Sequence, residues 1–266
     1  GIPVDVASTP ISLVTGWNWI GYLPQETHEV ATALSSISDS AMHMTSQYDG
    51  FTTNYGDYGW YGSLTSMKPG SGYMLQMAGF GDLVYPHDTS STTSDTSSFG
   101  RFNLPQTISD WSVNYGDYQH LGSITASIEN REDFDGDIVA VFVDDKCRGV
   151  AERMYFPFDD RYYYLIQVYS NDIDGEALTF KYYNSMTNKV VEYSETLPFT
   201  SNMIVGDGFS PFGLSNEKGN TLIPDEYSIS NAYPNPFNPT TEFTYSIPDE
   251  GMVNISIYDI SGRLVA

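Results

Sequence analysis

Two short acidic stretches carry the side chains best suited to hold a metal ion. Each combines carboxylates with a glycine, Gly136 in the first stretch and Gly175 in the second. The residues are Asp133, Asp135 and Asp137 in the first stretch, and Asn171, Asp172, Asp174 and Glu176 in the second. Calcium takes about six to eight oxygen ligands, which acidic, glycine-containing loops often supply, so both stretches are candidates for binding Ca2+ as a cofactor. Asp-Gly pairs are also typical of tight hairpin turns, and turns without a metal are the favoured interpretation.

Aromatic side chains are the second candidate for chemistry, as a surface that stacks on sugar rings. The pentapeptide Asn-Tyr-Gly-Asp-Tyr occurs twice, at residues 54–58 and 114–118, and its glycine and aspartate favour loops. Flat rings offer apolar faces, and tyrosine hydroxyls add hydrogen bonds. We therefore predict a ligand surface made of Tyr55, Tyr58, Trp60, Tyr61, Tyr115 and Tyr118. The alternative for each ring is a place in the hydrophobic core.

Motifs for catalysis are missing from the sequence. It contains no Gly-x-Ser-x-Gly elbow, no His-Glu-x-x-His zinc motif, no Cys-x-x-Cys pair and no phosphate-binding loop. The single cysteine, Cys147, rules out an internal disulfide, and the four histidines form no constellation with it, so we expect a structural cysteine. A hydrolase built on two carboxylates is an alternative, but we expect the protein not to be an enzyme.

The charge balance limits the partners. The chain has 34 acidic and 11 basic residues and a formal net charge of −23. Nucleic acids and anionic membranes attract basic surfaces, so both are excluded as expected partners. No apolar stretch reaches the about 20 residues that a membrane-spanning helix needs, and no membrane span is expected.

Short apolar runs separated by turn residues must position these side chains, and they predict a mainly β chain. The first region, residues 1–86, combines alternating strands with one short helix over residues 30–37, which Thr27 could cap. Residues 87–98 are a Ser/Thr/Asp-rich linker, and residues 99–215 are a β-sandwich. The expected strands of the sandwich cover residues 124–128, 138–143, 162–169, 177–183 and 189–193, and the expected turns contain Asp135-Gly136, Asp144-Asp145, Asp159-Asp160 and Asp174-Gly175.

The C-terminal part contains the most distinctive motif. Three prolines fix an extended chain, and the block IYDISGRLV follows after two alternating runs. The motif residues are Tyr233, Pro234, Asn235, Pro236, Phe237, Asn238, Pro239 and Thr240, followed by Gly262 and Arg263. Residues 227–266, after a linker at 216–226, resemble the immunoglobulin-like C-terminal sorting domain of the type IX secretion system of Bacteroidetes and related phyla. The resemblance implies export to the cell surface or the extracellular space.

Two further blocks resemble parts of exported proteins. The series GWNWI, GWYGSL and KPGSGYML is similar to a module of secreted multidomain proteins that carry the same sorting tail. The block GDIVAVFVDDKCRGVAE is similar to one common in exported Bacteroidetes-type β-sandwich domains. Neither resemblance implies a reaction.

The sorting-like region is expected to be incomplete, because an immunoglobulin-like sandwich needs about seven strands and residues 227–266 supply fewer alternating runs. Either the natural chain continues past Ala266, or the open sheet edge pairs with a strand from a neighbouring subunit. The expected function is therefore a non-catalytic secreted or cell-surface structural or adhesive protein, as a filament subunit completed by strand exchange. Self-association or a surface glycan is the expected interaction. The alternative is a carbohydrate-binding accessory region of a larger secreted polysaccharide-degrading enzyme.

Overall fold

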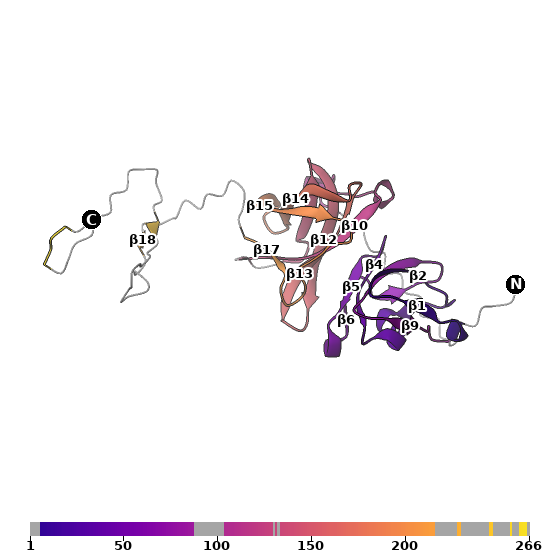
Figure 1. Cartoon of the computed structure of the whole chain (residues 1–266). Coiled ribbons are helices and arrows are strands. Elements are labelled where there is room, and N and C mark those ends of the chain that lie inside the picture. The colour runs from indigo at the N-terminus through magenta and orange to yellow at the C-terminus, as the bar shows by residue number, and fades with distance from the viewer. Residues whose placement is uncertain are drawn as a thin grey trace. The chain divides into compact units, whose positions relative to one another are not determined.

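The computed structural model describes residues 6–87, 104–129, 131 and 134–215, together with 228–229, 245–246, 256 and 261–264. The fold is mainly β, as predicted, with one short α-helix among these residues (Figure 1). Contacts divide the chain into two units, Gly1–Lys218 and Gly219–Ala266. In the second unit, β18 (Ser228–Ile229) pairs antiparallel with β19 (Tyr245–Ser246).

The N-terminal module, residues 6–87, is built on a five-stranded antiparallel sheet in the order β2-β8-β4-β5-β6. The strands are β2 (Gly16–Gly21), β8 (Gly72–Met77), β4 (Ala41–Ser46), β5 (Phe51–Asn54) and β6 (Trp60–Gly62). Two small pairs complete it, β1 (Ile11–Leu13) with β9 (Gly81–Leu83) and β3 (His28–Glu29) with β7 (Ser66–Met67).

The predicted helix of the N-terminal module is shorter than the apolar pattern indicated. It divides into α1 (Val30–Ala33) and the 3-10 turn η2 (Ser35–Ile37). The apolar residues of this segment do lie in the core, as the spacing predicted. The expected cap at Thr27 is wrong, because β3 occupies the two residues before the helix and Glu29 stands at the N-cap without a side-chain hydrogen bond.

The sandwich module, residues 104–215, contains an eight-stranded sheet in the order β15-β14-β11-β12-β13-β10-β16, with β17 also on β10. The strands are β10 (His120–Ile128), β11 (Ile138–Val143), β12 (Lys146–Phe156), β13 (Arg161–Ser170), β14 (Asp174–Asn184), β15 (Lys189–Thr200), β16 (Ile204–Val205) and β17 (Phe212–Leu214). All five predicted strands are present.

One long strand joins the two halves of this sheet. β12 pairs with β11 along its first part and with β13 along residues 153–156. Side chains of both halves, such as Ile166 from β13 and Phe180 from β14, meet in one core. The opposite face of β11 is buried as well, under Ile108 and Trp111 of the preceding segment. β11 is therefore buried along its whole length.

Three of the four predicted acidic turns are turns in the structure. Asp144 and Asp145 both have positive φ and close the β11–β12 hairpin, and Gly136 and Asp160 also have positive φ in turns. Asp174-Gly175 differs, because it begins β14 and pairs with β15 next to a register shift. Gly175 has φ of 92°, which a bulged strand end requires and which glycine adopts without strain.

The N-terminal module and the sandwich module pack against each other through a buried polar layer, called the seam below. On the N-terminal side it contains His43 and Thr45 of β4, and on the sandwich side Ser123 of β10 and Gln167 of β13. As a result, β13 is buried on both faces from its third residue onward. Along the parts of the chain that the structure describes, no helix has the length and apolar character needed to cross a bilayer.

Candidate functional site

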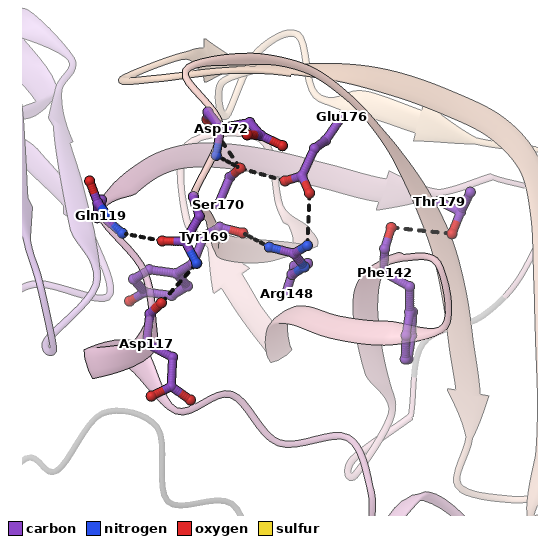
Figure 2. A network of polar contacts seen from close by, with 10 residues as sticks. Asp117, Gln119, Phe142, Arg148, Tyr169, Ser170, Asp172, Glu176 and Thr179 are labelled. Atoms are coloured by element: carbon purple, nitrogen blue, oxygen red, sulfur yellow. Dashed lines mark hydrogen bonds and ion pairs between the residues drawn. The ribbon is translucent and has the colours of Figure 1, made fainter.

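The second acidic stretch is organised around an arginine. Figure 2 shows Arg148 of β12 pointing at Glu176 of β14, with Nη2 2.8 Å from Oε1. Glu176 also accepts a hydrogen bond from Ser170, and Arg148 donates to the carbonyl of Tyr169 at 3.4 Å. Both members of the ion pair are largely buried. The guanidinium thus supplies the positive charge that this glutamate needs, at the residue where a calcium ion was predicted.

The neighbouring polar residues of this stretch hold a loop. The side chain of Asn171 accepts a hydrogen bond from the backbone N–H of Gln119 at 3.1 Å and donates one to the carbonyl of Asp117 at 2.9 Å (Figure 2). The backbone N–H of Asp172 donates to Ser170 Oγ at 2.8 Å. Asn171 therefore binds the backbone of the second Asn-Tyr-Gly-Asp-Tyr loop directly. Glu176 acts through Arg148, whose guanidinium lies over the ring of Tyr118 in the same loop.

The first acidic stretch separates into residues with different surroundings. Asp137 is fully buried, and its carboxylate accepts four hydrogen bonds of 2.6–2.8 Å. The donors are the N–H of Phe134, the hydroxyl of Tyr182, and the N–H and hydroxyl of Ser185. Asp135, whose side chain is 98% exposed, pairs with Arg153. Asp133 lies outside the described residues.

The geometry of the described acidic residues favours a structural role. No group of three or more His, Cys, Asp or Glu side chains with the spacing of a metal site occurs in the described part of the chain. The carboxylate of Asp137 is already saturated by donors, and burial of Tyr182 together with this bond raises the pKa of the Tyr182 hydroxyl. Calcium binding stays a prediction, which a titration must decide.

The first aromatic loop lies on the sandwich module. Its tyrosines pack on a group of phenylalanines from the sandwich, namely Phe156, Phe158 and Phe209. Tyr55 accepts a hydrogen bond from the N–H of Gly208 at 2.9 Å, and Tyr61 donates one to the carbonyl of Tyr155. Tyr58 stays largely exposed, and Trp60 packs against the N-terminal core. Three of the four rings thus contribute to the contact between the modules.

The second aromatic loop makes the reciprocal contact. The ring of Tyr115 lies 5.0 Å from that of Tyr169 and 6.3 Å from that of Tyr48, which belongs to the N-terminal module. Tyr118 lies 6.2 Å from Tyr169 and carries the guanidinium of Arg148 at 4.9 Å from its ring centre. Both copies of the pentapeptide are therefore located where the two modules meet, which their common loop composition did not reveal.

A serine–histidine contact in the seam has the distances of a nucleophile–base pair. His43 Nε2 lies 3.1 Å from Ser123 Oγ, and its Nδ1 lies 2.9 Å from Thr53 Oγ1. Burial lowers the pKa of His43 to about 3, whereas a general base works best with a pKa near the working pH. Both side chains of the pair are also buried. The contact therefore fits a role in joining the modules.

Two hollows border the seam. One, of about 370 Å3, lies beside the second aromatic loop and is lined by Trp19, Thr45, Asp49, Tyr118 and Gln119 among others. We call it the seam pocket. The other, of about 830 Å3, is more open and is lined by polar and apolar residues, Trp60 among them. Of the predicted ligand surface, the seam pocket includes only Tyr118.

The predicted ligand surface omits Trp19, and sequence reasoning missed Gln119 and Arg148 as site residues. Trp19 alternates with Ile20, so the period of two could have identified it as facing away from the core. Arg148 had no comparable signal, because its partner Glu176 is 28 residues away in the chain. Gln119 directly follows the second pentapeptide, and only the folded loop brings it to the pocket.

Most of the sorting motif lies outside the described residues, namely Tyr233, Pro234, Asn235, Pro236, Phe237, Asn238, Pro239 and Thr240. Gly262 and Arg263 are described and exposed, and Gly262 has φ of 81°. Comparisons of the chain with protein-family models, with curated proteins and with solved structures find no match.

Proposed function

We propose that this chain is a non-catalytic structural or adhesive part of an exported protein that acts at the cell surface or outside the cell. The observation that carries the proposal is the seam, which joins two β modules into one unit. Gln167 of the sandwich donates to Thr45 Oγ1 at 2.9 Å and to the carbonyl of Ser46 at 2.6 Å, and Tyr169 donates to the carbonyl of Gln47 at 2.9 Å.

A joined pair of modules suits a protein that presents a surface or carries load. Interfaces between domains of one chain are commonly small and permit relative motion. Here the seam is buried, hydrogen-bonded and flanked by aromatic contacts at both pentapeptide loops. The resemblance of residues 227–266 to a sorting domain supports export. Self-association of subunits into a filament by strand exchange is part of the same proposal.

Surface labelling of intact cells tests the proposal. Antibody against residues 104–215 should stain cells that express the full gene, and removal of residues 227–266 should abolish staining while the protein remains in the lysate. Purified protein coated on beads should promote attachment to cells, and electron microscopy should show filaments if strands exchange. Staining that is unaffected by the deletion, with beads that do not attach, would contradict export by this segment and adhesion.

A second function, that of a carbohydrate-binding accessory region, is favoured by a specific observation. Trp19 exposes 78% of its side chain at the edge of the seam pocket. A large exposed ring beside a concave polar surface is a usual feature of ligand sites. A glycan array is the direct test of this function.

A further inference from the structure

The seam pocket is built by both modules. Its lining includes Thr45 and Met74 of the N-terminal sheet, residues 46–49 and, from the sandwich, residues 118–121 and Tyr169. Its volume of about 370 Å3 is near the lower end of the roughly 300–1,000 Å3 typical of small-molecule sites. Such a pocket accommodates one or two small rings rather than a long chain.

A row of side chains leads from the seam into this pocket. In the N-terminal sheet, Trp19 is directly opposite Met74, and Met74 is directly opposite Thr45. Residues directly opposite in a sheet share a face, so Trp19 continues the face that the sandwich covers at Thr45. The sandwich ends before Trp19, which leaves this indole exposed at the pocket edge. An aromatic ring so placed offers a flat platform to a ligand seated in the pocket.

The polar groups around the platform are suited to hydroxyl groups. Gln119 lines the pocket and offers an amide that both donates and accepts. Asp49 lines it as well, and its carboxylate is 3.1 Å from the ammonium of Lys68, which balances its charge. His120 contributes an imidazole whose Nδ1 lies 3.1 Å from Ser201 Oγ. Donors and acceptors are thus mixed around an apolar ring.

The charges and ring contacts disfavour ionic ligands. A protein with a net charge of −23 repels anions over its surface. A cation would be attracted by the exposed face of Trp19, but the carboxylate of Asp49 is already paired with the Lys68 ammonium at 3.1 Å, and the ring of Tyr118 already has Arg148 at 4.9 Å. A neutral molecule with apolar C–H faces and several hydroxyl groups fits the lining best.

The wall of the pocket is held in place before a ligand arrives. Three contacts fix the loop that forms this wall: the hydrogen bonds of Asn171 to Gln119 and Asp117, the Arg148–Glu176 pair (Figure 2), and the stacking of Arg148 on the ring of Tyr118. A wall fixed in advance lowers the entropy cost of binding.

We propose that the seam pocket binds a neutral saccharide, with the ring of Trp19 stacked on a sugar face and with Asp49 and Gln119 hydrogen-bonded to its hydroxyl groups. This inference rests on the second of the proposed functions, carbohydrate binding. It identifies the location of the site and the class of its ligand.

Isothermal titration and tryptophan fluorescence of the full chain test the site. The probes are neutral tetrasaccharides (β-1,4-glucan, β-1,3-glucan, xylan and mannan fragments), with sialyllactose as the anionic and choline as the cationic arm. At least one neutral probe should bind and shift the emission to shorter wavelength. Trp19→Ala should weaken its binding by about tenfold or more, because stacking removes on the order of 60 Å2 of apolar surface from water.

A matched variant separates the site from a general surface effect. Phe80→Ala removes a ring of similar exposure, 79%, that does not line the pocket, and it should bind the neutral probe as the wild type does. Gln119→Ala should weaken binding with an unchanged melting temperature. No binding of any neutral probe, binding confined to sialyllactose or choline, or binding unaffected by Trp19→Ala would each overturn the proposal. Binding that persists in Trp19→Ala would remove the seam pocket as the site but keep carbohydrate binding as a function, whereas no binding of any neutral probe would remove both. The export and adhesion experiment uses no saccharide and is independent of these results.

Discussion

Replacing Arg148 by methionine should destabilise the protein strongly, because it leaves a buried carboxylate without its counter-ion. The side chains of Arg148 and Glu176 are only 10% and 16% exposed. Methionine keeps most of the apolar stem but removes the ion pair, the bond to the carbonyl of Tyr169 and the cation over Tyr118. Breaking a buried pair costs about 3–5 kcal/mol, and some solvent access lowers this to roughly 2–4 kcal/mol.

Urea unfolding followed by circular dichroism measures this free energy of unfolding. Glu176→Leu alone should also destabilise, because it leaves the guanidinium unpaired. The double variant Arg148→Met with Glu176→Leu should recover about half or more of the summed loss, because neither charge is then left unpaired. A loss below about 1 kcal/mol for Arg148→Met, or strictly additive losses in the double variant, would refute the buried-pair argument.

Four further perturbations test other parts of the structure. Burial lowers the pKa of His43 to about 3 from 6.5, so the stability that its neutral form contributes is complete above pH 6.5 and is lost as pH falls toward 3. Between pH 7 and pH 4, the free energy of unfolding in urea should therefore fall by roughly 2–4 kcal/mol more for the wild type than for His43→Gln. Asp137→Asn replaces one of two acceptor oxygens by an NH2 donor that faces existing donors, so it should lower the free energy of unfolding by about 3 kcal/mol or more. The loss should be the same with and without millimolar calcium. An unfolding midpoint that depends on calcium only in the wild type would instead make Asp137 a calcium ligand. Burial raises the pKa of Cys147 to about 12, so iodoacetamide at pH 8 should label it only after unfolding, as mass spectrometry would report. Gly149→Ala would place its Cβ 2.4 Å from the backbone oxygen of Gln167 and should lower the free energy of unfolding by about 2 kcal/mol or more. Gly21→Ala has open space at its Cβ and should lower the free energy of unfolding far less, and the melting temperatures of the two variants should differ accordingly.

The sequence predicted the strands better than it predicted what covers them. The run at residues 138–143 was recognisable because β-branched and aromatic residues stood between turn signals. Alternation alone places Tyr163 opposite Tyr162 and Tyr164, but Tyr163 and Tyr164 are both buried. Tyr164 lies in the sandwich core, and Tyr163 packs on Phe156 beneath the first aromatic loop. A second buried face depends on a module distant in the chain, which local periodicity does not encode.

The sequence showed which residue types could form a site, but it showed much less of the role that each residue has in the folded protein. The acidic stretches were recognisable as polar and loop-forming, but hydrogen-bond saturation of Asp137 depends on Ser185, 48 residues further along the chain. The aromatic pentapeptides were recognisable as unusual. Their position at the seam depends on the packing of two modules, and only the folded structure places the exposed ring of Trp19 at the pocket.

The paired pentapeptide loops also bear on how such a chain can be rebuilt. The loop at residues 54–58 contacts the sandwich through Gly208 and Phe158, and the loop at residues 114–118 contacts the N-terminal module through Tyr48. Each module thus contributes one loop that contacts the other module. The residues that make these contacts lie in the modules themselves and not in the peptide that joins them. Two separately produced modules should therefore associate in solution. A β module that carries the same loop could replace its counterpart, so the pair can serve as a template for recombining β modules.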